Sequence, residues 1–249
     1  MFSEKGLARV LVAAVMVLTG PAMALEQKEE ILMAGQFHLL SADIAMISYD
    51  PENADYLMQA DDTLTTVSSL LPSWVEDLAP EQQSQARQEW SGLVEILRGS
   101  DGYPGLLEGY DLNLDANQRI HYDTLQGIIF AGPHLQDAAL SDIEKIYLRV
   151  TSVVAGYVAL TANPFGSMAM SANDGDSKVV ALTSEIDALF SAALKNSSSP
   201  MEKQALRRQQ AKWQFIRGTV MQGSQSAMPY IVRFQGKQIA REMAALIEG

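Results

Sequence analysis

The amino-acid sequence predicts an all-α protein built from two four-helix-bundle units in tandem. Apolar residues recur at steps of three and four over most of the chain, which is the spacing of an amphipathic α-helix and not that of a strand. Prolines and glycines end these periodic stretches, as they do at helix boundaries. The order of the stretches in the first half returns in the second half, which favours an internal repeat.

The stretch at 31–47 predicts the core helix around which the first unit is organised. Its apolar stripe consists of Met33, Phe37, Leu40, Ile44 and Ile47. A second stripe of small residues, interrupted by His38, would let a neighbouring helix approach closely. Its members are Ala34, Ser41 and Ala45. Gln36 and Asp43 lie seven residues apart and are expected on the solvent side. The helix should run over 27–49.

Three further helices complete the first unit, which we place at 26–135. They are expected at 52–71, 80–98 and 117–130. Pro72 should end the first of these helices, and Pro80 opens the next as a first-turn proline. Residues 99–115 contain four glycines and a proline and therefore predict a long loop.

The second unit is placed at 140–249 and opens on a capping box. Ser141 can cap a backbone N–H while Glu144 reaches back to the serine's own N–H. The helix that follows should stop at Asn163, with a loop over 165–177. Later helices are expected at 178–195, at 201–222 and from Pro229 onward. Phe234 should face the core in the last helix, together with Ile231, Ile239 and Met243.

A tryptophan helix supports the repeat, because each half has one that begins with several glutamines. Trp90 belongs to the first and Trp213 to the second, and apolar residues follow each ring at helical spacing. Both rings are expected in the core. The similarity is faint residue by residue, so chance similarity is the alternative to duplication.

The first 24 residues have the organisation of a secretory signal peptide. Lys5 and Arg9 precede an apolar run at 10–18, and Ala22-Met23-Ala24 is a small-x-small cleavage site. The mature chain should begin at Leu25 and be periplasmic. An uncleaved membrane anchor is the alternative, although the run is short for a membrane span. We expect no later stretch to be apolar enough to cross a membrane.

Composition excludes several classes of function. The chain has no cysteine, which excludes a lipoprotein anchor, disulfides and a thiol nucleophile. The formal net charge is −12, and removal of residues 1–24 leaves −13. Because an acidic protein repels phosphate backbones and anionic lipids, neither nucleic acid nor a membrane surface is an expected partner. The chain contains no HExxH, GxSxG, P-loop or GxGxxG pattern, so we expect no enzyme and no cofactor.

Two features could hold a metal ion or another ligand. The first is the D-x-N-x-D-x-N alternation at 111–117, which is how calcium loops begin. Ala116 replaces the turn glycine and Tyr122 replaces the closing glutamate, so we expect an Asx-rich turn and no metal. The second is His38, which is either a hydrogen-bonded histidine at a helix seam or a ligand residue.

The opening helix also resembles a known family. Residues 31–45 read ILMAGQFHLLSADIA, which is similar to the first helix of the PilJ/NarX-like sensor domain, the N-terminal domain of type IV pili methyl-accepting chemotaxis transducers. That helix reads approximately I-x-x-A-G-R-Q-R-M-L-S-Q-R-M-A. The shared positions are Ile31, Ala34, Gly35, Leu40, Ser41 and Ala45. The tryptophan helices also resemble the third helix of that family.

This resemblance implies a periplasmic four-helix sensor bundle whose ligand binds to the first helix. In nitrate-responsive members an arginine of this helix holds the anion at a dimer seam. The arginine positions of the family fall here on Gln36, His38 and Asp43. An acidic seam with Asp43 would repel an anion, so we expect no nitrate or nitrite binding. We expect a neutral polar or cationic ligand if these residues and Ser41 form a site.

Two functions remain open from the sequence. The first is a soluble, non-catalytic periplasmic sensor or ligand-binding accessory module. Its partners would be a membrane-bound transducer or sensor kinase, on which signalling would depend, and a second copy of the chain in a homodimer. The second is a structural or protein-interaction bundle of the cell envelope without a small-molecule ligand. A polar pocket at His38 would favour the first, and an exposed apolar patch would favour the second.

Overall fold

The computed structural model describes residues 4–100, 103–108, 111–162, 172–223 and 227–249, and it confirms the all-α fold class. The α-helices of these residues are α1 (Glu4–Tyr49), α2 (Ala54–Glu76), α3 (Pro80–Arg98), α4 (Leu112–Phe130), α5 (Asp142–Ala162), α7 (Ala172–Asn196), α8 (Pro200–Gln222) and α9 (Pro229–Glu248). Two short 3₁₀ turns, η1 (Pro133–Leu135) and η2 (Asp137–Ala139), connect α4 to α5. A minimal antiparallel hairpin, β1 (Gly99–Ser100) and β2 (Tyr103–Pro104), follows α3.

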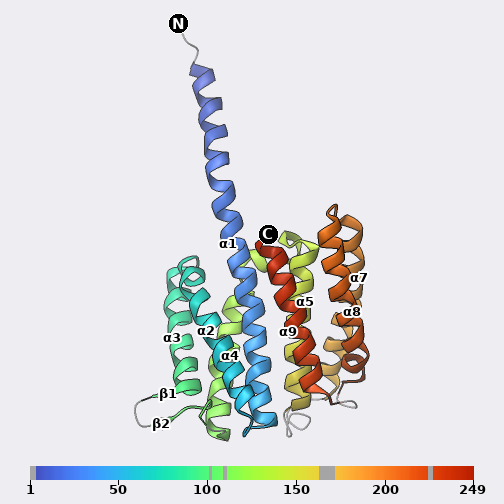
Figure 1. The fold of residues 1–249 in the computed structure, drawn as a ribbon. Coiled ribbons are helices and arrows are strands. Elements are labelled where there is room, and N and C mark those ends of the chain that lie inside the picture. The colour runs from blue at the N-terminus through green and yellow to red at the C-terminus, as the bar shows by residue number, and fades with distance from the viewer. Residues whose placement is uncertain (1–3, 101–102, 109–110, 163–171, 224–226) are drawn as a thin grey trace.

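The helices stand side by side, with the first half of the chain on one side of the bundle and the second half on the other (Figure 1). Helix α1 packs against α2 and α5, and α5 packs in turn against α7 and α9. Helix α3 packs mainly on α4, and α8 packs against both α7 and α9. A single hydrophobic core contains buried residues of both halves. The division into units at 26–135 and 140–249 stays a prediction, since the halves share this core through α1 and α5.

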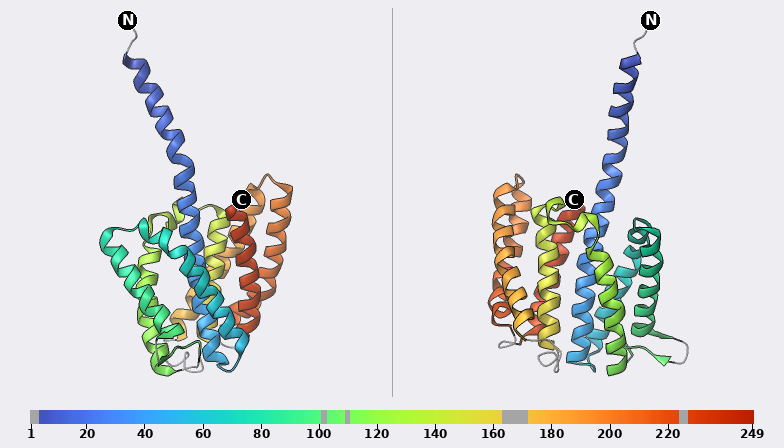
Figure 2. Two further views of the ribbon diagram at one scale, coloured as in Figure 1. Left: turned by 60° about the vertical axis from the view of Figure 1, so that its left-hand side comes forward. Right: turned by 180° about the vertical axis from the view of Figure 1, so that it is seen from behind.

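Helix α1 buries the stripe that the sequence predicts. Met33, Phe37, Leu40 and Ile47 are 0% exposed, and Ile44 is 3% exposed. By length and composition the Gln27–Tyr49 part of α1 could cross a membrane, so the expectation that no such stretch follows the signal segment is wrong. Most of this part is buried inside the bundle, which is the state of a core helix. The N-terminal part of α1 projects beyond the bundle in every view (Figures 1 and 2).

Helices α1 and α5 touch at a glycine. A Cβ atom on Gly35 would lie 2.1 Å from Cε1 of Tyr147, so only glycine allows this ring to lie against the α1 backbone. The Tyr147 hydroxyl donates a hydrogen bond to the carbonyl oxygen of Leu32 at 3.1 Å. The close approach of α1 and α5 therefore occurs at Gly35, which is not a member of the predicted stripe of small residues.

Three predicted boundaries are wrong. Pro72 lies inside α2 rather than at its end, because Trp74 and Val75 continue the buried stripe at 3% and 0% exposure. Their burial outweighs the backbone hydrogen bond that proline removes. Helix α4 begins at Leu112 within the predicted loop, and α7 begins at Ala172 rather than at 178. The rest of that second loop, 165–171, lies outside the described residues, as does Asn163.

The capping box and both tryptophans are confirmed. The backbone N–H of Ser141 donates to Oε2 of Glu144 at 2.7 Å, and the N–H of Glu144 donates to Oγ of Ser141 at 3.3 Å. Trp90 is 7% exposed and Trp213 is fully buried. The prediction that Phe234 faces the core is wrong, since its side chain is 47% exposed beside the groove described below.

Candidate functional site

The four predicted ligand residues lie on two different sides of α1. Gln36 lines a groove formed by α1, α2 and α9. His38 and Ser41 line a separate pocket formed by α1, α4, α5 and α7. Asp43 faces α2 and α9 and is fully buried. The structure therefore brings His38 together with Ser41, and it does not bring all four residues into one site.

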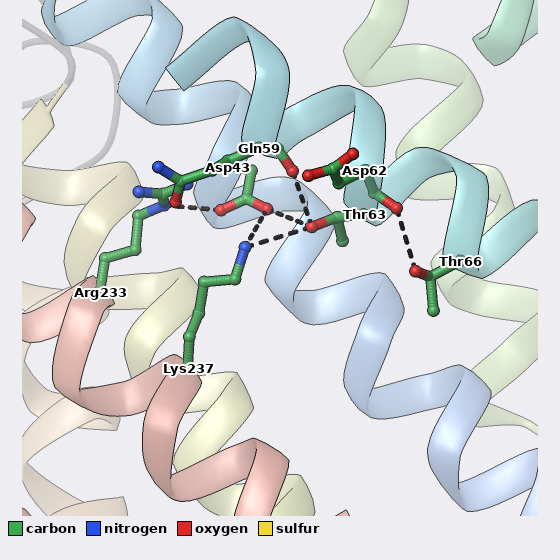
Figure 3. A network of polar contacts seen from close by, with 7 residues as sticks. All are labelled: Asp43, Gln59, Asp62, Thr63, Thr66, Arg233 and Lys237. Atoms are coloured by element: carbon green, nitrogen blue, oxygen red, sulfur yellow. Dashed lines mark hydrogen bonds and ion pairs between the residues drawn. The ribbon is translucent and has the colours of Figure 1, made fainter. Parts of the chain in front are cut away.

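Asp43 is the centre of a buried ion-pair network (Figure 3). Its Oδ1 accepts a hydrogen bond from Nε of Arg233 at 2.6 Å. Its Oδ2 accepts one from Nζ of Lys237 at 2.7 Å and lies 2.5 Å from Oγ1 of Thr63. Lys237 also donates to this threonine oxygen at 3.2 Å. The network thus connects α1, α2 and α9 through one carboxylate.

This network corrects the expected position of Asp43. The sequence places Asp43 on the solvent side and predicts an acidic seam, but the carboxylate is 0% exposed and has two cationic partners. A buried carboxylate requires such compensation, because leaving a charge unpaired in the interior is costly. The seam consequently has one positive charge more than negative, and the repulsion expected between Asp43 and an anion loses its basis.

Arg233 has binding capacity that the network leaves unused. Its side chain is 2% exposed, and its Nη2 atom has no hydrogen-bond partner in the described part of the chain. The guanidinium carbon lies 5.5 Å from the ring centroid of Tyr56, which is within the range of a cation–π contact. Burial raises the pKa of Tyr56, and the nearby charge of Arg233 opposes that rise. The ring therefore stays neutral beside the guanidinium.

A groove of about 570 Å³ opens above this network. Helix α1 forms its floor with Gln36 and Leu39. The α2 wall contains Gln59, Asp62, Thr63 and Thr66, and the α9 wall contains Phe234, Lys237, Gln238, Arg241 and Glu248. Lys237 lines the groove and reaches from α9 toward Thr63 of α2 (Figure 3). Nine of its thirteen lining residues are polar or charged, although apolar atoms provide most of its exposed lining surface. The buried ion pair fixes one of its cations.

The pocket at His38 is smaller, at about 340 Å³, and its polar groups are mostly neutral. Nδ1 of His38 lies 3.3 Å from Oγ1 of Thr151, and the imidazole stacks on Phe130 with ring centroids 4.5 Å apart. Burial raises the pKa of Tyr122, and a hydrogen bond with Ser41 opposes part of the rise. The residues that the sequence places at the seam are thus bonded to their protein neighbours.

Sequence reasoning missed the cations of α9. Arg233, Ala240 and Ile247 are spaced by seven residues, and all three are buried. An arginine in phase with a buried stripe indicates a buried acidic partner, so the signal was present. The sequence did not reveal which acidic residue is the partner, because Asp43 lies 190 residues away from Arg233.

The described residues contain no group of three or more histidine and acidic side chains placed to hold a metal ion. Nδ1 of His121 lies 2.7 Å from Oε2 of Glu89, which joins α4 to α3. The acidic alternation at 111–117 lies mostly in the first turns of α4. That position is helical and is not the loop that a calcium site requires.

No family model, curated protein or solved structure matches this chain. The resemblance to the PilJ/NarX-like sensor domain therefore stays a prediction from the first helix.

Proposed function

We propose that this protein is an exported, non-catalytic binding module of the sensor type, and that its ligand binds in the groove between α1, α2 and α9. The observation that supports this proposal is the buried Asp43–Arg233–Lys237 network beneath a polar groove. Buried ion pairs contribute little net stability compared with apolar packing. A network of this kind is better explained by the fixed geometry that it gives to Lys237 at the base of the groove.

The groove has the size and composition of a small-molecule site. Its volume of about 570 Å³ lies within the range of ~300–1,000 Å³ that such sites occupy. Its floor belongs to the helix that resembles the ligand-binding helix of the PilJ/NarX-like family. The side chains around it offer hydroxyl, amide and charged groups for orienting a polar ligand. No set of nucleophile, base and oxyanion donors accompanies them in the described residues, which supports binding without catalysis.

Export to the periplasm is part of this proposal. The segment that resembles a signal peptide forms the part of α1 that projects from the bundle (Figure 2). Removal of residues 1–24 would leave the core helix and its buried stripe in place. We propose a membrane-bound transducer or sensor kinase as the partner that receives the signal. Sequencing the N-terminus of the exported chain tests this part, with Leu25 expected and a retained Met1 contradicting it.

A groove-filling variant tests the binding proposal. The exported chain is screened by thermal unfolding against amino acids, short peptides, sugars, organic acids and inorganic ions. A ligand at about 100 times its Kd should add about 2.7 kcal/mol to the free energy of unfolding. Ala245→Phe should abolish that gain, because Ala245 lines the groove. Ala211→Phe is the control on the exposed surface of α8. The proposal fails if no compound stabilises the chain, or if Ala245→Phe leaves the gain unchanged.

An exposed aromatic patch favours the second candidate function, a protein-interaction bundle. We define this aromatic patch as Tyr49, Tyr230 and Phe234, which are 51%, 51% and 47% exposed. The rings of Tyr230 and Phe234 stack with centroids 6.1 Å apart. Exposed aromatic side chains are enriched in protein interfaces. Replacing Tyr49 and Tyr230, neither of which lines the groove, with serine should weaken capture by a partner under this alternative, and should leave small-ligand binding largely intact.

A further inference from the structure

We propose that the ligand of the groove is a short peptide with free termini, bound with its carboxylate toward α9 and its ammonium group toward α2. This inference rests on the proposed binding function and adds the chemical class of the ligand. It follows from three properties of the groove, which are the distribution of charge across it, the amide groups along it and the aromatic ring at one end.

The two walls of the groove differ in net charge. Lys237 and Arg241 are one helical turn apart on the α9 wall, which also contains Glu248, and Asp62 is on the α2 wall. Asp43 already neutralises much of the charge of Lys237 through a 2.7 Å contact. Arg241 is therefore the main site for a ligand carboxylate, which a guanidinium binds well in planar, bidentate geometry. Asp62 is exposed on its wall and can pair with a ligand ammonium group.

This distribution favours a zwitterion over an ion of a single sign. A simple anion would gain from Arg241 but would also meet the carboxylates of Asp62 and Glu248, which line the same groove. A simple cation would meet Arg241 and Lys237. A ligand that presents both charges can satisfy both walls, because opposite charges attract and like charges repel at these short ranges.

The remaining polar groups match the backbone of a peptide. Three glutamine side chains line the groove, namely Gln36, Gln59 and Gln238. Each carboxamide has one acceptor and two donors, so it can pair with a peptide N–H and C=O at the same time. A single amino acid has no peptide group to pair with three such side chains.

Phe234 gives the groove an apolar contact for a ligand side chain. Its ring is 47% exposed, lines the groove and stacks on Tyr230. An aromatic ring left half-exposed next to polar walls can stack on an aromatic or aliphatic side chain of a peptide. We therefore expect peptides with a large apolar residue to bind more tightly than peptides of alanine alone.

The test compares a peptide with its capped form. The probe is alanyl-phenylalanyl-alanine with free termini, and the comparison is the same tripeptide with an acetylated N-terminus and an amidated C-terminus. Calorimetric titration of the exported chain should show saturable binding of the free peptide. Capping both ends should weaken binding about ten-fold or more, because each end loses a charge-assisted hydrogen bond.

Matched variants assign each end of the peptide to a wall. Arg241→Gln should weaken the free peptide about ten-fold and should have little effect on the peptide that is amidated at its C-terminus alone. Asp62→Asn should likewise weaken binding of the free peptide, and should have little effect on the peptide that is acetylated at its N-terminus alone. The controls are Arg208→Gln on α8 and Glu95→Gln on α3, which remove one positive and one negative charge, respectively, at exposed positions outside the groove.

Each outcome distinguishes this inference from the proposed function. Equal affinity for the free and capped peptides would overturn the claim about the termini and would indicate a segment of a partner protein as the ligand. Failure of the tripeptide to bind, with another screened compound lost in Ala245→Phe, would overturn the peptide class and leave the binding function standing. If no screened compound binds, both proposals fail.

Discussion

The two sides of α1 satisfy their polar groups in different ways. On the side of α2 and α9, the carboxylate of Asp43 is fully buried and paired with two cations. On the side of α4 and α5, the imidazole of His38 lies against a threonine hydroxyl and a phenylalanine ring. The first side fixes charges at the base of an open groove, and the second consists mostly of neutral contacts between helices. This difference supports our proposal that the ligand binds on the charged side.

Loss of Asp43 should have the largest effect on stability. Asp43→Ala leaves Arg233 buried without its ion partner, so the free energy of unfolding should fall by about 3–5 kcal/mol. Urea denaturation measures this change. Asp61→Ala is the matched control, because Asp61 also pairs with an arginine, Arg98, but both side chains are more than 40% exposed. That control should cost no more than about 1 kcal/mol, and equal losses in the two variants would contradict the contrast between buried and surface pairs.

The contact between α1 and α5 is testable at Gly35. Gly35→Ala places a methyl group in the space of the Tyr147 ring, and overpacking of this kind typically costs about 1–3 kcal/mol. Gly127→Ala is the control, because nothing lies within 4 Å of its added Cβ. It should stabilise α4 by about 0.5–1 kcal/mol. Thermal unfolding of both variants checks the prediction, and an unchanged midpoint for Gly35→Ala would show that α1 and α5 can separate without cost.

Replacing His38 on the neutral side should lower the free energy of unfolding by less than replacing Asp43 does. His38→Ala leaves Oγ1 of Thr151 without the imidazole, but that hydroxyl keeps the carbonyl oxygens of Tyr147 and Leu148 as acceptors at 3.0 and 3.1 Å. The cost should lie toward the lower end of about 1–3 kcal/mol. A loss in urea denaturation as large as that of Asp43→Ala would remove the distinction between the sides.

A buried carboxyl at the start of the core part of α1 should give the smallest effect, and it should depend on pH. Glu30 is 7% exposed, and its Oε1 has no hydrogen-bond partner in the described residues. Burial raises the pKa of Glu30 above its ordinary value, and the nearby His134 opposes part of that rise. The folded chain therefore retains this proton to higher pH than the unfolded chain, and stability falls as pH rises from about 4.5 through the folded pKa.

Glu30→Gln should remove this pH dependence. The variant should exceed the wild type in free energy of unfolding by on the order of 1 kcal/mol near neutral pH, and the difference should shrink as pH falls toward about 4.5. Urea denaturation at both pH values measures the two differences. Glu29→Gln, at the neighbouring and more exposed position, is the control. A difference that is constant with pH would contradict the assignment to Glu30.

Local signals predicted the parts of the fold that depend on neighbouring residues. The capping box of Ser141 and Glu144 needs only a spacing of three, and the buried stripe of α1 needs only helical periodicity. The end of α2 was mispredicted because the penalty of Pro72 is local, whereas the burial of Trp74 that outweighs it depends on tertiary packing. The same limit applies to the candidate site. Asp43 was singled out from one helix, but Arg233 and Lys237 pair with it only after the chain has folded.

We propose that the ligand binds on the charged side of α1 and not on the neutral side. The most direct measurement is a nuclear magnetic resonance titration of the exported chain with alanyl-phenylalanyl-alanine. The side-chain Nε–H signal of Arg241 and the imidazole signals of His38 report on the two sides. We expect saturable chemical-shift changes at the Arg241 signal and no change at the His38 signals. Saturable shifts at His38 with Arg241 unchanged would contradict this proposal.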